Sequence, residues 1–219
     1  MQTEAIRVFV YQFFARTGQP PSTIAIANEF GISEEDAQAR LAELANSRHL
    51  VLGAEGEILM AHPFSSIPLG FAVMGSQTLW WGGCAWDSFA LPHVIENQPV
   101  VLVSTNCPNC QAALAWNIGI NEPPKGDQLA HFLVPTSKMW DDVVHTCGNQ
   151  RIFCNQACIN QWLVDNQLPQ GYVMSLETLW NLASGWYAGR LSEGYVRREP
   201  AAAKEYFRKA GLSGEFWGL

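Results

Sequence analysis

The sequence has no apolar run long enough to cross a membrane. A spanning helix needs roughly 20 consecutive apolar residues, and none of the apolar stretches in this 219-residue chain approaches that length. The N-terminus also lacks the basic region, uninterrupted apolar stretch and small-residue cleavage site of a secretory signal peptide. These absences predict a cytoplasmic protein with no membrane partner.

Positive charge is scarce as well. The chain has 13 lysines and arginines against 20 aspartates and glutamates, a formal net charge of -7. Proteins that bind nucleic acids need a basic surface, because contacts to phosphates supply much of the affinity. The balance therefore predicts no nucleic-acid partner. With 48% hydrophobic and only 15% charged residues, the chain should form one domain, or a small domain beside a larger one.

Cysteine is too sparse for a dense disulfide framework, since six cysteines are spread over the whole chain. In a reducing compartment, cysteines that gather in space more often bind a metal or take part in catalysis. The positions of these six residues are therefore the most informative feature of the sequence.

Residues 1–62 are predicted to form three helices followed by a β-hairpin with its turn at 53–56, which together resemble a winged helix-turn-helix. The third helix carries a net charge of -3, because four acidic residues oppose only Arg40; they are Glu34, Glu35, Asp36 and Glu43. A helix that enters the DNA major groove should be basic or neutral. We therefore expect a packing module that does not bind DNA.

Residues 63–219 alternate short apolar strands with short helices and end in a helical tail. This pattern predicts an α+β fold, in which helices flank a mixed or antiparallel β-sheet core. The linker at 61–70 is expected to lie over that core.

The segment from Trp80 to Asp87 places a thiol and a carboxylate three residues apart, at Cys84 and Asp87. Three residues are about one helical turn, so both side chains can face the same space. A thiol at a helix N-terminus is held partly as thiolate by the exposed amides. A second thiol, Cys154, follows Phe153 far downstream. Two thiols and a carboxylate can bind a soft metal ion and move a proton.

These residues resemble the organomercurial lyases, or alkylmercury lyases. That family carries Cys-x-x-Asp and, far downstream, Phe-Cys; residues 84–87 match the first motif and residues 153–154 the second. Residues 104–107 fall where the family has a further, non-catalytic cysteine, and residues 171–177 resemble a late strand-to-helix step. The resemblance covers roughly residues 20–191 and includes the family's winged-helix-like N-terminal region, which covers the catalytic core.

The resemblance implies a mercury-detoxifying enzyme that protonates the carbon of a carbon–mercury bond and yields a hydrocarbon and mercury(II). It assigns Cys84 and Cys154 as thiolates that bind mercury. Asp87 becomes the proton shuttle and then a ligand of the product ion. No organic cofactor is implied, and the bound mercury(II) would pass to thiol carriers or to a mercuric reductase.

The remaining cysteines exceed what this resemblance requires. Cys107-x-x-Cys110 is typical of half a zinc site. One possible zinc site combines this pair with Cys154 and Cys158, which would remove Cys154 from catalysis. Another combines it with Cys147 and Cys158, which leaves Cys84 and Cys154 free for catalysis.

Two other functions therefore stay open: a zinc- or copper-binding protein on the same scaffold, and a winged-helix metal sensor. If Cys154 faces Cys107, Cys110 and Cys158 while Cys84 is remote, the zinc protein is favoured over the lyase. Three histidines lie nearest the motifs but show no ligand spacing, so we assign them to structure or surface: His93, His131 and His145.

Overall fold

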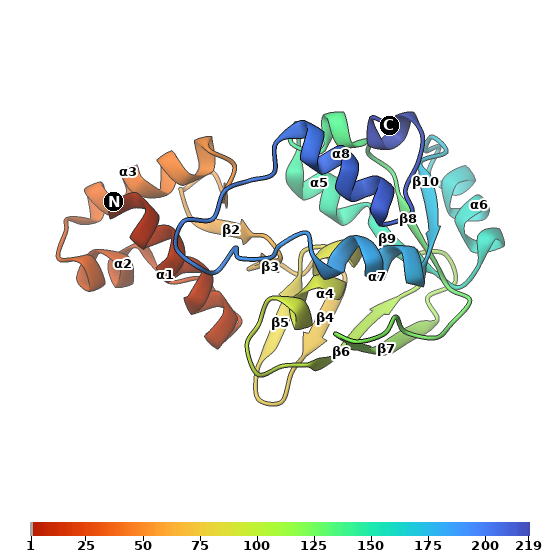
Figure 1. Ribbon diagram of the computed structural model, residues 1–219, viewed down its shortest axis with the longest axis horizontal. Coiled ribbons are helices and arrows are strands. Elements are labelled where there is room, and N and C mark those ends of the chain that lie inside the picture. The colour runs from red at the N-terminus through yellow and green to blue at the C-terminus, as the bar shows by residue number, and fades with distance from the viewer. Residues whose placement is uncertain (1) are drawn as a thin grey trace.

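The computed structural model describes residues 2–219 (Figure 1). Its first three elements are the expected helices α1 (Gln2–Thr17), α2 (Thr23–Phe30) and α3 (Glu34–Asn46). Ser22 and Ser33 act as the N-caps of α2 and α3, where each hydroxyl accepts a hydrogen bond from a backbone amide of the first turn. The helices form one end of the molecule (Figure 1).

A short antiparallel hairpin follows, made of β1 (Val51–Leu52) and β2 (Ile58–Ala61). β2 then pairs with β3 (Phe64–Ser65), and β3 pairs with a strand of the core. The N-terminal helices and the core thus share one sheet, and hydrogen bonding crosses the boundary expected at residue 62. The winged-helix class and that boundary remain predictions.

Two antiparallel sheets form the rest of the scaffold. The seven-stranded sheet has the order β1-β2-β3-β5-β4-β6-β7, and the three-stranded sheet has the order β10-β8-β9. The strands not yet given are β4 (Phe71–Met74), β5 (Leu79–Gly82), β6 (Val100–Asn106), β7 (Ala113–Gly119), β8 (Leu129–Phe132), β9 (Gln150–Phe153) and β10 (Tyr172–Ser175). This arrangement confirms an α+β fold with antiparallel sheets and flanking helices.

The remaining α-helices are α4 (Ala85–Ala90), α5 (Val143–Gly148), α6 (Gln156–Asp165), α7 (Leu176–Ser184) and α8 (Pro200–Lys209). Short 3-10 turns occupy Leu91–His93, Thr136–Lys138 and Glu215–Trp217. α4 ends at Ala90, shortly before Pro92, which has no amide hydrogen to continue a helix. α7 ends at Ser184, before Gly185, since glycine is a poor helix former.

α4 is the buried centre of the molecule. All six of its residues are buried, and it contacts β4 and β5 of the large sheet, β9 of the small sheet, and α7. Side chains at its N-terminus therefore sit where the two sheets meet. Within residues 2–219, no helix is both long enough and apolar enough to cross a membrane.

Candidate functional site

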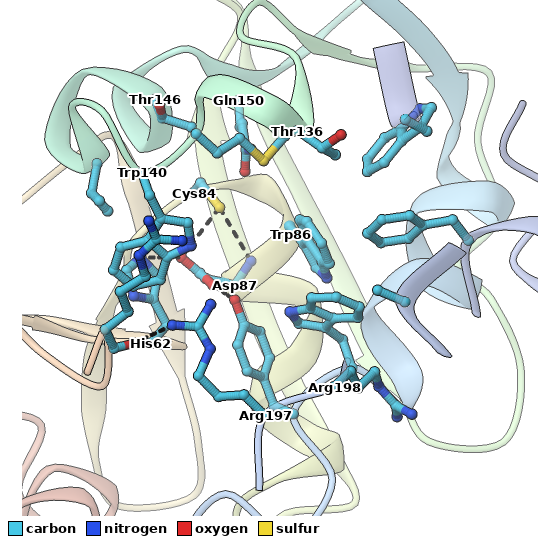
Figure 2. Close-up of a pocket in the computed structure, with 18 of the residues that line it drawn as sticks. His62, Cys84, Trp86, Asp87, Thr136, Trp140, Thr146, Gln150, Arg197 and Arg198 are labelled. Atoms are coloured by element: carbon cyan, nitrogen blue, oxygen red, sulfur yellow. Dashed lines mark hydrogen bonds and ion pairs between the residues drawn. The ribbon is translucent and has the colours of Figure 1, made fainter. Parts of the chain in front are cut away.

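Cys84 is the N-cap of α4, and Asp87 lies in its first turn. The Cys84 thiol lies 3.2 Å from Asp87 Oδ2, to which it donates, and the Asp87 backbone amide donates to the same sulfur at 3.4 Å. A Cβ at Gly83 would collide with the Asp87 carboxylate, which explains the glycine that precedes the thiol. The local sequence thus folds so that thiol and carboxylate face each other (Figure 2).

A second thiol and an imidazole complete the cluster. Cys147 of α5 lines the same pocket as Cys84, close enough for each thiol to shift the pKa of the other. His62, which follows β2, places Nε2 3.4 Å from the Cys147 sulfur and 4.0 Å from Asp87 Oδ2. All four side chains are buried. Residues far apart in the sequence, from the two helices α4 and α5 and from the segment between β2 and β3, therefore meet at one point.

The two thiols differ in protonation. The hydrogen bond from Cys84 and the neighbouring His62 lower the pKa of Cys147 to about 7, against the effect of burial. Burial, together with Cys147 and Asp87, raises the pKa of Cys84 well above its usual value. Burial alone would lower the pKa of His62, but Asp87 and Cys147 outweigh it and raise that pKa. Cys147 is therefore the thiolate of the pair, and Cys84 carries a proton.

The pKa values of the two thiols contradict the expectation that the N-terminus of α4 holds Cys84 as a thiolate. The backbone amide of Asp87 does lower the pKa of Cys84, but burial, the Cys147 thiol and the Asp87 carboxylate each have a larger effect in the opposite direction. Complete burial beside a carboxylate outweighs it, because a second negative charge at that point would be poorly solvated.

The other oxygen of Asp87 is held by Tyr187, whose hydroxyl donates to Oδ1 at 2.5 Å. Burial, with Asp87 and Cys84 nearby, raises the pKa of Tyr187 well above its usual value, so the hydroxyl remains a donor. The Arg190 guanidinium lies 5.1 Å from the centre of the Tyr187 ring. Asp87 is thus fixed at both oxygens, with Oδ2 turned toward Cys84.

A pocket of about 520 Å³ opens over this cluster and is lined by Cys84, Asp87, Cys147 and His62. Trp86 packs against five other rings at 5.0–6.4 Å between centroids: Phe132, Trp186, Tyr187, Phe207 and Trp217. The pocket wall thus contains much aromatic surface.

Polar atoms also face this pocket. Thr146 Oγ1, Gln150 Oε1 and Trp86 Nε1 are buried and have no hydrogen-bond partner within residues 2–219. Exposed or half-buried cations add positive charge to the lining: Arg48, Arg197, Arg198 and Lys204.

Cys154 does not join this site, so the expected convergence of Cys84, Asp87 and Cys154 is wrong for its third member. Gln150 at the start of β9 lines the pocket, whereas Cys154 follows the end of the strand, roughly 13 Å further along at 3.3 Å per residue. There it faces Cys107, Cys110 and Cys158, and the four sulfurs lie within 4.8 Å of one another.

The predicted zinc site made of Cys107, Cys110, Cys147 and Cys158 is also wrong at one position. Cys147 lies in the pocket, and Cys154 takes its place in the cluster. The other set, in which Cys154 is the fourth member, has the grouping that the structure shows. No motif marks His62, so its place in the site could not be predicted from the sequence. One signal pointed to Cys147. If the closely spaced cysteines 107/110 and 154/158 form one cluster, the two left over are Cys84 and Cys147.

A family model described as alkylmercury lyase matches residues 64–188, more than half of the sequence. Among solved structures, the mercury-bound form of MerB2 has a similar fold, with a TM-score of 0.63 and 19% sequence identity over 87% of this chain and 92% of that chain. No curated protein matches.

Proposed function

The chain belongs to the alkylmercury lyase family, and from this premise we propose that Cys84, Asp87 and Cys147 carry out its reaction. Its function is the cleavage of the carbon–mercury bond of organomercurials, which yields a hydrocarbon and mercury(II) in mercury detoxification. The observation that carries the residue assignment is the meeting of two thiols and a carboxylate in one buried pocket.

The first proposed step is the attack of the Cys147 thiolate on mercury. Mercury(II) is a soft ion that prefers sulfur, and the thiolate displaces the weakly bound ligand of the organomercurial. Cys147 is suited to this step because its pKa of about 7 makes a large fraction ionised at neutral pH. His62 stabilises that charge from 3.4 Å.

The second step recruits Cys84. Its proton passes across 3.2 Å to Asp87 Oδ2, and the new thiolate binds the same mercury. Two sulfur ligands raise the electron density on mercury and weaken its bond to carbon. Asp87, now a carboxylic acid, gives that proton to carbon as the bond breaks, and the hydrocarbon leaves. Cys84 has then lost one proton and carbon has gained one, while Asp87 is again a carboxylate that holds mercury(II).

Replacement of Cys147 and Cys154 one at a time distinguishes these assignments. Cys147→Ser should lower hydrocarbon release by on the order of 10³-fold or more, because a neutral hydroxyl replaces the attacking thiolate. Cys154→Ser should lower hydrocarbon release per folded chain far less than Cys147→Ser, because Cys154 lies outside the pocket and can affect it only through β9 and α5. Benzene released from a phenylmercury salt measures both rates, and circular dichroism gives the folded fraction. The reverse order of activities would restore Cys154 to the active site and refute Cys147.

Tyr187 should act by positioning Asp87. Tyr187→Phe removes the hydrogen bond to Oδ1 but leaves both sulfurs. A hydrogen bond to a charged group contributes about 1.5–3 kcal/mol, so kcat should fall roughly 10–100-fold. KM should stay within a few-fold, since mercury binds through the thiols. Steady-state kinetics with one organomercurial provide the test. An increase in KM at unchanged kcat would show that Tyr187 shapes the pocket and does not orient the acid.

The proposed steps use no resident cofactor. We propose that mercury(II) leaves by transfer to thiol carriers or to a mercuric reductase, in the cytoplasm. The cations in the pocket lining, including Arg48 and Arg197, would attract an anionic thiol carrier.

Cys154 faces Cys107, Cys110 and Cys158 while Cys84 lies in the other site, which is the arrangement expected to favour a zinc protein. Family membership outweighs that expectation, because Cys147 supplies the second thiol beside Cys84. It disfavours a metal sensor and a dedicated zinc- or copper-binding protein as the main function.

The N-terminal module is proposed to be winged-helix-like and to cover the core without reading DNA. The Trp80 indole donates to the Phe14 carbonyl of α1 at 3.0 Å. Arg7 of α1 donates to the carbonyls of Arg190 and Ser192 at 2.5 and 2.6 Å. The two Arg7 contacts hold the segment that follows Tyr187, so the module supports one wall of the active site.

A further inference from the structure

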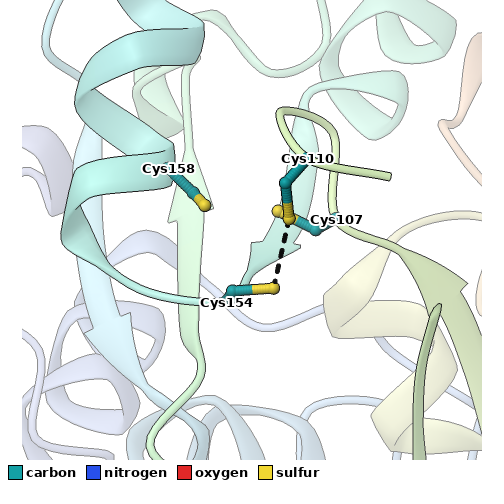
Figure 3. A group of neighbouring side chains, drawn as sticks. All are labelled: Cys107, Cys110, Cys154 and Cys158. Atoms are coloured by element: carbon teal, nitrogen blue, oxygen red, sulfur yellow. Dashed lines mark hydrogen bonds between the residues drawn. The ribbon is translucent and has the colours of Figure 1, made fainter. Parts of the chain in front are cut away.

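The four cysteines outside the active site come from two short turns that approach each other (Figure 3). Cys107 and Cys110 lie in the turn between β6 and β7, while Cys154 follows β9 and Cys158 lies in the first turn of α6. All four sulfurs lie within 4.8 Å of one another, and the Cys110 and Cys154 sulfurs are 3.5 Å apart. All four thiols are free.

These distances match a tetrahedral metal site. Four sulfurs at about 2.3 Å from a zinc ion lie roughly 3.8 Å from one another. The observed cluster needs only sub-ångström to ångström adjustments to reach that arrangement. The 3.5 Å between Cys110 and Cys154 is too long for a covalent bond between sulfurs.

The two turns are built to hold sulfur ligands. In the first turn, the Gln111 amide donates to the Cys107 carbonyl at 2.9 Å, and the Cys107 amide donates to Ala112 at 2.9 Å. In the second, the Asn155 side chain caps α6 by accepting from the Cys158 amide at 3.0 Å. Such outer contacts orient the ligands of metal sites.

A metal ion bound at this cluster would stabilise the local fold. In the described part of the chain, the fully buried Cys107 packs with four other buried apolar side chains, Leu133, Phe153, Ile159 and Leu163, and half-buried ones such as Trp162 surround them. This core is separate from the main one and much smaller, so it contributes less stability by itself. A metal ion would join the β6–β7 turn to β9 and α6, and β9 directly follows the helix that carries Cys147.

We propose that Cys107, Cys110, Cys154 and Cys158 bind one zinc ion in a closed structural site. Four thiolates in tetrahedral array select zinc or iron, and a site filled by four protein ligands leaves no open position for catalysis. The zinc holds β9 and α5 in place for the active site and takes no part in carbon–mercury cleavage. It also occupies four thiolates that would otherwise compete for mercury(II).

Metal analysis of the full chain tests the site. Protein purified anaerobically without a metal-binding tag should contain one zinc per chain. Cys110→Ser and Cys158→Ser should lose it, whereas Cys84→Ser and Cys147→Ser, matched losses of a thiol from the pocket, should keep it. Cys158→His should retain zinc, because imidazole is also a zinc ligand. A zinc-free or iron-loaded wild type would overturn the proposal, as would loss of zinc from Cys147→Ser.

Cobalt(II) substitution keeps the test decisive if the serine variants fail to fold. Cobalt(II) alone, added to zinc-stripped wild-type chain, should give the intense visible bands of a tetrahedral thiolate complex. A weak octahedral spectrum would refute the site. Removal of zinc with a chelator should also lower the melting temperature, since metal binding at such sites is coupled to folding. These readouts do not depend on hydrocarbon release, so failure here is distinguishable from failure of the proposed active site.

Discussion

A Cys84→Ser variant is expected to fold normally and to lose hydrocarbon release by on the order of 10³-fold or more, the scale seen when a nucleophile is removed. The serine hydroxyl is hard and stays protonated at neutral pH, so it neither binds mercury nor passes its proton to Asp87 Oδ2 across the 3.2 Å that separates the groups now. The rate of benzene release from a phenylmercury salt provides the measurement.

The fold should survive this change because serine is a preferred helix N-cap. Cys84 already serves as the N-cap of α4, where its sulfur accepts from the Asp87 amide at 3.4 Å. A serine oxygen can accept the same bond. Circular dichroism and an unchanged zinc content would verify that the variant is folded. Near-normal turnover by such a folded chain would remove Cys84 from the mechanism.

Local elements of the fold could be predicted because neighbouring residues determine them. Ser22 and Ser33 illustrate this, because serine is a preferred N-cap and each caps the helix that follows it in the structure. The motif at Cys84 and Asp87 was readable for the same reason, since two residues one helical turn apart meet wherever the helix goes. The antiparallel sheets followed from short apolar strands separated by turns.

The thiol that partners Cys84 could not be predicted from neighbouring residues, because its identity depends on how distant elements pack. Cys154 follows phenylalanine at the end of β9 and resembles the family motif, but the strand runs away from the pocket. Cys147 lies on the short helix α5 before that strand, and the packing of β9 against α4 brings α5 to Cys84. His62 reaches the pocket only through the pairing of β2 with β3. No spacing along the chain encodes such contacts.

Asp87→Asn should uncouple mercury binding from carbon–mercury cleavage. The asparagine amide can neither accept the Cys84 proton nor deliver one to carbon, so release should slow by roughly 10²–10⁴-fold, the typical contribution of general acid–base catalysis. The organomercurial should still bind, because the Cys147 thiolate and His62 remain. A single-turnover experiment that follows both protein-bound organomercurial and released hydrocarbon will separate the two steps.

Asp165→Asn is the matched control, since Asp165 is an exposed carboxylate at the end of α6 and its loss should leave the rate unchanged. The accumulating species in Asp87→Asn should be the intact organomercurial on Cys147, recognisable by its mass on the protein. Weak binding with normal turnover at saturation would show that Asp87 only supports the N-terminus of α4. In that case the proton must come from another donor, and the hydrogen bond from Tyr187 to Oδ1 would have no catalytic purpose.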